Sequence, residues 1–233
     1  MVKVVSFDVW NTLLRLEVVY ERLAETLAPI LKMEKDKVLE KILEAYNEAK
    51  RARRLGKLKA SEILKSSREI MASKLGIDLK LLPNIIAEAM ASIKSEEIVI
   101  DEVPKVLEDI KNLGLKIVTL GNVLFWPSTL TRKLLDSAGI SRFFDAQFYS
   151  DELGVHKPDG KAFLMICKVL NVEPEEVLHV GDGIAEDLGG ALTVGFKAVL
   201  ISDHVSEPIS IGDNIHIIPH IRHLTHVIKN LRR

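Results

Sequence analysis

The sequence predicts an α/β protein in which a Rossmann-like, mostly parallel sheet carries an inserted helical domain. After residue 98, short apolar segments alternate with helical segments, which is typical of a parallel sheet covered by helices on both faces. Residues 15–97 contain no convincing strand and repeat apolar side chains at three- and four-residue spacing. We therefore expect one domain made of residues 1–14 and 98–233, and a second, helical domain of residues 15–97.

The chain opens with an apolar segment, residues 2–10, in which Asp8 is the single acid. Its nearly continuous run of Val and Phe side chains predicts a strand that is buried on both faces. The helical region that follows should hold about four helices, because breaks fall near residues 32–35, 55–56, 76 and 83.

The rest of the chain supplies the alternating elements of the sheet domain. We expect strands at residues 115–121, 146–150, 177–181 and 197–202. We expect helices at residues 104–113, 130–138, 159–170 and 184–194. Gly114 and Gly139 follow two of these helices and are typical helix stops. Ligands bind such sheets at the carboxyl ends of the strands, so the residues just after each strand are the candidate site residues.

Each of four predicted strands ends in polar or backbone-permissive residues, namely Asp8, Gly121-Asn122, Ser150-Asp151 and Gly181-Asp182. If the strands are parallel neighbours, these ends gather at one edge of the sheet. Lys157 lies in the loop after the third of them, and Asp187 follows Asp182 by about one helical turn. Carboxylates held together repel one another, and a hard divalent cation such as Mg²⁺ removes that repulsion.

These segments, in this order, resemble the four motifs of the haloacid dehalogenase superfamily. The segments that carry the resemblance are FDVWNTLL, KIVTLGN, GVHKPD and HVGDGIAED. The helical insertion between the first and second motifs resembles the α-helical cap of the haloacid dehalogenase-like branch. The motifs agree in order and spacing, and together they cover nearly the whole chain. By this resemblance, the chain is identified as a member of the superfamily.

The resemblance implies a role for each matching residue. Asp8 would be the nucleophile and Lys157 the lysine that neutralises charge on the transferred group. The group itself would be bound by Thr12, Gly121 and Asn122. A Mg²⁺ cofactor would be held by Asp8, the backbone carbonyl of Trp10, Asp182 and Asp187. Attack by Asp8 on phosphorus or carbon would give a covalent aspartyl intermediate that water releases.

Two positions depart from the motif pattern. Where phosphatases of this superfamily carry a second Asp that protonates the leaving alcohol, this chain has Trp10, and an indole cannot act as a general acid. Haloacid dehalogenases carry an aromatic residue there, so Trp10 favours that reaction, whereas Asp182 and Asp187 favour a magnesium enzyme. In the second motif, Gly121 replaces the usual Ser or Thr; either its amide serves alone, which we prefer, or Thr119 supplies the hydroxyl.

The residues favour a Mg²⁺-dependent phosphatase that acts on a small phosphorylated compound through an aspartyl-phosphate on Asp8. One alternative is a 2-haloacid dehalogenase that uses the same nucleophile on carbon. Another is a binding or regulatory protein of this fold with weak catalysis, since the general acid is missing. The sequence leaves the physiological substrate and the oligomeric state open.

Composition limits the possible partners. Hydrophobic residues make up 47% and charged residues 28% of the 233 residues, and the formal net charge of −1 gives no nucleic-acid footprint. No stretch is long and apolar enough for a membrane span, and the first residues lack the layout of a secretory signal. The lone Cys167 fits a reducing compartment. We therefore expect a cytoplasmic protein with a small, anionic substrate and neither nucleic-acid nor membrane partners.

Overall fold

The computed structural model describes residues 1–232 and divides the chain into two compact units. The first unit comprises Met1–Leu14, Val99–Asn122 and Ile140–Arg233, and the second comprises Arg15–Ile98 and Val123–Gly139. The second unit thus includes the segment from Val123 to Gly139, which was predicted to belong to the sheet domain.

The first unit is built on a seven-stranded sheet with the strand order β3-β2-β1-β4-β5-β7-β6. Every neighbouring pair is parallel except β6 and β7. The strands are β1 Val4–Phe7, β2 Lys116–Gly121, β3 Ala146–Tyr149, β4 Val177–Gly181, β5 Lys197–Ile201, β6 Ile209–Ile211 and β7 Ile215–Ile218. The predicted α/β class with a mostly parallel sheet is confirmed.

The central strands are short and wholly buried, as their continuous apolar runs predict. All four residues of β1 and all five of β4 are buried. In the register of these two strands, Ser6 lies beside His179 and Phe7 beside Val180. Because β1 has β2 on one side and β4 on the other, the residues that follow these three strands share one edge of the sheet.

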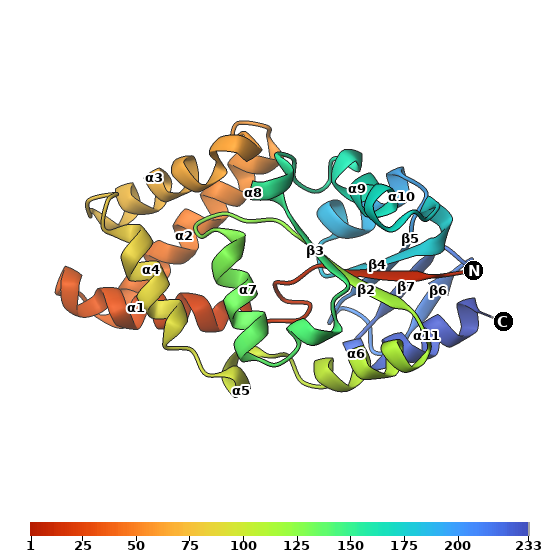
Figure 1. The fold of residues 1–233 in the computed structure, drawn as a ribbon. Helices are drawn as coiled ribbons and strands as arrows, with labels where there is room; N and C mark the ends of the chain where they lie inside the picture. The colour runs from red at the N-terminus through yellow and green to blue at the C-terminus, as the bar shows by residue number, and fades with distance from the viewer. Residues whose placement is uncertain (233) are drawn as a thin grey trace. The chain divides into compact units, whose positions relative to one another are not determined.

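Helices cover both faces of this sheet, with α9 and α10 on one face and α6 and α11 on the other (Figure 1). The helices of this unit are α6 Val103–Asn112, α8 Ser150–Leu153, α9 Gly160–Leu170, α10 Gly190–Thr193 and α11 Leu224–Leu231. Phe163 of α9 packs edge-on against Phe196, with ring centroids 5.8 Å apart. This apolar contact belongs to the cluster that fixes α9 on the sheet.

The second unit is helical, and each of its longer helices buries one apolar stripe. Its helices are α1 Leu16–Leu31, α2 Lys35–Arg54, α3 Ile63–Leu75, α4 Leu82–Ala91, α5 Ser95–Ile98 and α7 Ser128–Ser137. On α1, Leu23 and Leu27 recur at helical spacing and are fully buried. Gly76 ends α3 in the left-handed conformation that favours glycine.

Two features of the first unit differ from the sequence prediction. The expected single helix over residues 184–194 is a π-helical segment, η4 Ile184–Gly189, followed by the short α-helix α10. The strands β6 and β7 were not predicted. β6 is only three residues long and all three are exposed, so it has no buried face whose apolar pattern could be recognised. Among residues 1–232, no helix has the length and apolarity that a membrane crossing requires.

Candidate active site

Asp8 stands at the end of β1, where the chain leaves the sheet in a tight turn. Its backbone N–H donates to the carbonyl of Val180 at 2.8 Å, which extends the pairing with β4 by one residue. The carbonyl of Val9 then accepts from the N–H groups of Leu13 and Leu14 at 2.8 and 2.9 Å. The turn also needs a left-handed residue, and Asn11 supplies it with a φ of 60°.

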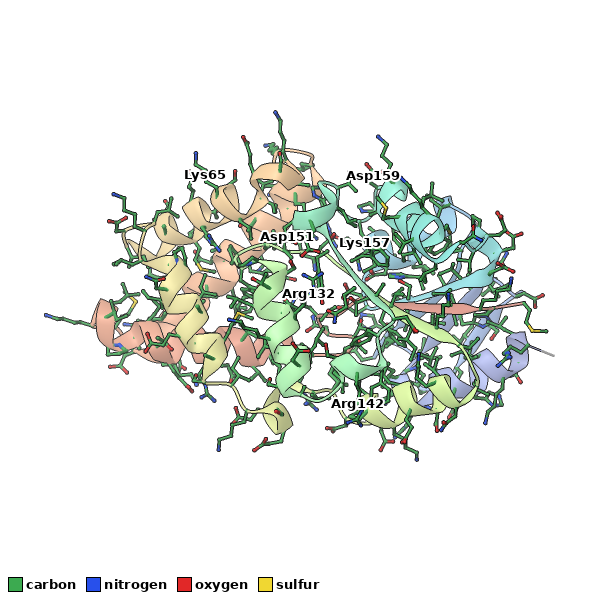
Figure 2. The ribbon with its side chains drawn as sticks, viewed as in Figure 1. Lys65, Arg132, Arg142, Asp151, Lys157 and Asp159 are labelled. Carbon is green, nitrogen blue, oxygen red and sulfur yellow. The ribbon has the colours of Figure 1, made fainter. Side chains whose placement is uncertain are left out.

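Lys157 is held by the side chain of Asn122, which follows β2. The Oδ1 atom of Asn122 accepts from the Lys157 N–H at 2.9 Å, and its Nδ2 donates to the Lys157 carbonyl at 3.0 Å. Two residues on, Asp159, which is labelled beside Lys157 in Figure 2, caps α9. Its side chain accepts from the N–H of Lys161 at 2.9 Å. The lysine therefore sits in a loop that is fixed from both sides.

The Lys157 ammonium joins two carboxylates that are far apart in the sequence. Its Nζ donates to Oδ1 of Asp8 and to Oδ1 of Asp187, both at 2.6 Å. Lys157 is 2% exposed, and both acids are buried as well. In such a water-poor setting, charge-assisted bonds are short and strong, and removal of the ammonium would leave buried carboxylates without a compensating charge.

The carboxylate of Asp187 fits only because two glycines leave room for it. A Cβ atom on Gly181 would overlap the Asp187 carboxyl carbon, and one on Gly183 would lie 2.8 Å from Asp187 Oδ2. The same Oδ2 accepts from the N–H of Gly183 at 2.8 Å. Asp187 lies on the π-helical turn η4, which also buries Glu186, and π-turns of this kind often occur at functional sites.

The charges of this group strongly perturb one another. Burial raises the pKa of Asp8 to about 7, because desolvation of the carboxylate and repulsion from Asp187 and Asp182 outweigh the attraction of Lys157. Burial acts on Asp187 as well, yet the Lys157 ammonium and a hydrogen bond from His179 hold its pKa well below the ordinary value. Burial opposes the charge on Lys157, but Asp187 and Asp8 raise the pKa of the ammonium.

A metal ion could be held by three of these carboxylates. Asp8, Asp182 and Asp187 each offer one oxygen, and the three oxygens lie within 4.8 Å of one another. Asp182 is the exposed member, and its Oδ2 accepts from Nδ2 of Asn11 at 3.4 Å. An all-oxygen set of acids suits a hard cation such as Mg²⁺. Trp10 lies on the same turn as Asn11, just after the end of β1.

The residues expected to bind the transferred group lie at the same edge. Thr12 is 1% exposed, and its hydroxyl has no hydrogen-bond partner among residues 1–232. Gly121 ends β2, and a Cβ atom there would lie 2.9 Å from the ring of Tyr149, so this position has no room for a Ser or Thr side chain. Thr119 is fully buried inside β2, beside Phe7 in the register.

Sequence reasoning missed two polar residues behind this edge, His179 of β4 and Ser6 of β1. The His179 ring lies 3.1 Å from Asp187 Oδ1 through Nε2 and 3.0 Å from the Ser6 hydroxyl through Nδ1. The sequence does contain a signal for them, because each is the one polar residue within an otherwise apolar strand, VVSF for Ser6 and VLHVG for His179. Such a residue must find a partner when it is buried.

The fold and this edge define an α/β enzyme with buried charges at the carboxyl ends of parallel strands. A family model described as a haloacid dehalogenase-like hydrolase matches residues 2–195. The chain belongs to the haloacid dehalogenase-like hydrolases and is an enzyme of that superfamily.

Curated relatives of known name match part of the chain. The glyceraldehyde 3-phosphate phosphatase of Methanopyrus kandleri is 34% identical over 43% of this chain and 42% of its own length. The phosphoglycolate phosphatase of Aquifex aeolicus is also 34% identical, over 42% of this chain and 45% of its own length. The (S)-2-haloacid dehalogenase 4A of Burkholderia cepacia is 31% identical over 44% of this chain and 42% of its own length. The matched part thus spans less than half of each relative.

Solved structures match the fold over the whole chain. A HAD phosphatase from Thermococcus onnurineus has a TM-score of 0.68 at 24% identity, with full coverage of both chains. The L-2-haloacid dehalogenase of Xanthobacter autotrophicus has a TM-score of 0.73 at 20% identity, and it covers 99% of this chain and 100% of its own. At these identities the likeness concerns the fold alone.

Proposed function

We propose that this hydrolase is a Mg²⁺-dependent phosphatase that acts on a small phosphorylated compound through an aspartyl-phosphate on Asp8. The observation that carries the proposal is the group of three carboxylate oxygens within 4.8 Å, one of them on the proposed nucleophile. Three acids against the single ammonium of Lys157 leave an excess of negative charge, which a divalent cation would balance. The curated relatives named as phosphatases support the same reading.

In the first step, a carboxylate oxygen of Asp8 attacks phosphorus, and the bond from phosphorus to the leaving oxygen breaks. In the second step, water attacks the same phosphorus and the bond from phosphorus to the Asp8 oxygen breaks. One water proton stays on the released inorganic phosphate, the other passes through solvent to the departed leaving group, and the Asp8 carboxylate is restored. Lys157 stays beside Asp8 throughout and balances the charge on the phosphoryl oxygens. The unpartnered Thr12 hydroxyl and the Gly121 amide are the donors we assign to those oxygens.

Asp8, Asp182, Asp187 and the Trp10 carbonyl are the groups that would hold Mg²⁺. When bound, the ion supplies positive charge next to the phosphoryl group and keeps Asp8 ionised. Without a cation, the neutral form of Asp8 would predominate below about pH 7, since its pKa is raised to about 7.

The indole of Trp10 restricts the substrate class. With no acid at that position, the leaving oxygen must depart as an anion or take its proton from water. Acyl phosphates and aryl phosphates satisfy this condition, whereas alkyl phosphates would react slower by the roughly 10²–10⁴-fold that general acid catalysis supplies. We therefore assign the enzyme a phosphorylated substrate with a stable leaving anion.

We also propose that residues 15–97, the inserted helical segment, act as the cap domain that selects the substrate. The insertion enters directly after the turn that carries Asp8 and returns just before α6. The partner we assign is a small anionic molecule. The lone Cys167 supports a reducing location, for which we propose the cytoplasm.

One observation favours a second candidate, a 2-haloacid dehalogenase. Displacement of halide from carbon needs no proton donor, so an indole at position 10 would not slow that reaction. The relative from Burkholderia cepacia carries such a name. Asp182 and Asp187 are the argument against it, because a metal-free reaction has no use for two further carboxylates beside the Asp8 nucleophile.

The deciding experiment measures phosphate release from acetyl phosphate and p-nitrophenyl phosphate, and chloride release from 2-chloropropionate. Each assay is run with millimolar Mg²⁺ and again with EDTA. We expect phosphate release that requires Mg²⁺ and disappears in Asp8→Asn. Chloride release that persists in EDTA would establish the dehalogenase instead, and inactivity in all assays would favour a binding or regulatory protein.

A further inference from the structure

Behind the charged group, the interior of the sheet contains a second polar pair that the proposed chemistry does not use directly. His179 is fully buried in the middle of β4, and Ser6 lies beside it in the register of β1. The His179 ring packs edge-on against Phe163 of α9, with centroids 5.1 Å apart at 84°. An apolar side chain would serve this packing equally well, so the imidazole and hydroxyl call for another explanation.

The hydrogen bonds of His179 fix which ring nitrogen carries the proton. Nε2 lies 3.1 Å from Oδ1 of Asp187, and an ionised carboxylate can only accept. Nε2 is therefore protonated and donates. In the neutral ring Nδ1 is then an acceptor, so the Ser6 hydroxyl, 3.0 Å away, donates to it.

The donors around Asp187 leave its carboxylate one orientation. Oδ1 accepts from Lys157 at 2.6 Å and from His179 at 3.1 Å, while Oδ2 accepts from the N–H of Gly183 at 2.8 Å. Lys157 in turn donates to Asp8 from the same ammonium. The direction of the Lys157 ammonium thus depends on where Asp187 Oδ1 is held, and His179 is the donor that reaches this oxygen from inside the sheet.

We propose that His179, oriented by Ser6, is a positioning residue that holds Asp187 so that Lys157 bridges Asp187 and the Asp8 nucleophile. The chain of contacts runs from Ser6 through His179, Asp187 and Lys157 to Asp8, and every link lies between 2.6 and 3.1 Å. It connects the interiors of two adjacent strands to the residue at which the reaction takes place. Partners that orient a functional carboxylate from behind are typically worth 10–100-fold in activity.

The first test compares two substitutions that remove the imidazole. His179→Gln keeps an N–H donor near the place of Nε2, whereas His179→Leu removes it. We expect His179→Leu to lower kcat by about 10–100-fold with KM changed by less than about threefold, and His179→Gln to recover most of that loss. Ser6→Ala should cost roughly threefold to tenfold, because His179 then loses its orienting donor. Equal losses in the Gln and Leu variants would mean that His179 only packs, and would overturn the proposal.

The kinetic test rests on the proposed phosphatase function. The second test does not depend on activity. Long-range ¹H–¹⁵N spectra of the metal-free protein distinguish the two imidazole tautomers. We expect His179 to be protonated on Nε2 in the wild type, and this preference to weaken in Asp187→Asn. Protonation on Nδ1 in the wild type would break the link to Asp187 and refute the proposal. An enzyme without phosphatase activity would refute the proposed function, while the spectra would still decide the role of His179.

Discussion

The raised pKa of Asp8 predicts that the metal-free protein is destabilised by its own nucleophile. The folded state holds the proton of Asp8 up to about pH 7, whereas the ordinary value for this carboxyl is 3.8. Between these values the folded protein binds more protons than the unfolded chain, so its stability falls as pH rises. The stability that the neutral carboxyl provides is complete below about pH 4 and is lost as pH rises through 7. Asp8→Asn removes this dependence, because the amide stays neutral at every pH.

The size of the effect follows from the shift. About three pKa units at roughly 1.4 kcal/mol each give about 4 kcal/mol at pH 8, and about 1–2 kcal/mol at pH 5. The Asn amide has the shape of the neutral carboxyl but a different hydrogen-bond donor. We therefore expect Asp8→Asn to raise the free energy of unfolding by roughly 2–4 kcal/mol at pH 8. A nucleophile that weakens the folded state in this way is the usual form of a stability–activity trade-off.

The assay is urea unfolding in EDTA at pH 5, 6, 7 and 8. Trp126→Phe in every protein leaves Trp10 as the single indole, so the fluorescence reports on the unit that contains Asp8. The surface variant Asp203→Asn is the matched control and should stay within about 0.5 kcal/mol of its parent throughout. A difference between Asp8→Asn and its parent that is constant or shrinks from pH 5 to pH 8 would refute the reasoning. Added Mg²⁺ should stabilise the parent more than the variant.

Three further predictions concern Lys157, Trp10 and Asp182. Lys157→Met should abolish turnover and lower the free energy of unfolding by about 3–5 kcal/mol, because it leaves buried carboxylates without a cation. The control Lys111→Met breaks the partly exposed Lys111–Asp145 pair at 2.9 Å and should lower the free energy of unfolding by less than about 1 kcal/mol. Similar losses for the two variants in urea unfolding would contradict this prediction. Trp10→Asp should raise the hydrolysis of glycerol phosphate relative to acetyl phosphate by up to about 10²-fold, whereas Trp10→Asn should not; an unchanged ratio would show that position 10 does not protonate the leaving group. Asp182→Asn should raise the Mg²⁺ concentration for half-maximal activity by more than about tenfold, and an unaltered Mg²⁺ titration would remove Asp182 from the metal ligands.

Much of the fold could be read from the sequence because buried parallel strands and their helices have strong local patterns. The strand at residues 177–181 was predicted with the bounds of β4, and the others differ by a few residues at their ends. The meeting of Asp8, Lys157 and Asp187 was also predictable, since parallel neighbours must align their carboxyl ends.

The features that escaped prediction depend on register and on local backbone geometry. The pairing of Ser6 with His179 exists only once β1 and β4 are neighbours in a particular register, and a single strand does not specify its partner. The π-turn of η4 escaped for a similar reason, because the sequence around Asp187 fits an ordinary helix equally well. The use of Asn122 to hold the Lys157 backbone, with bonds of 2.9 and 3.0 Å, required the loop conformation itself.

The position of one carboxylate accounts for several of these otherwise separate features. Asp187 reaches Lys157 only because Gly181 and Gly183 have no side chains, and it keeps its orientation through donors from His179 and Gly183. Each of these residues would be a poor choice on local grounds alone, since glycine weakens a strand end and a buried imidazole must be satisfied. Because these residues occur together, we infer that the sequence around β4 is adapted to hold Asp187, which in turn holds the ammonium of Lys157. This adaptation lowers local stability.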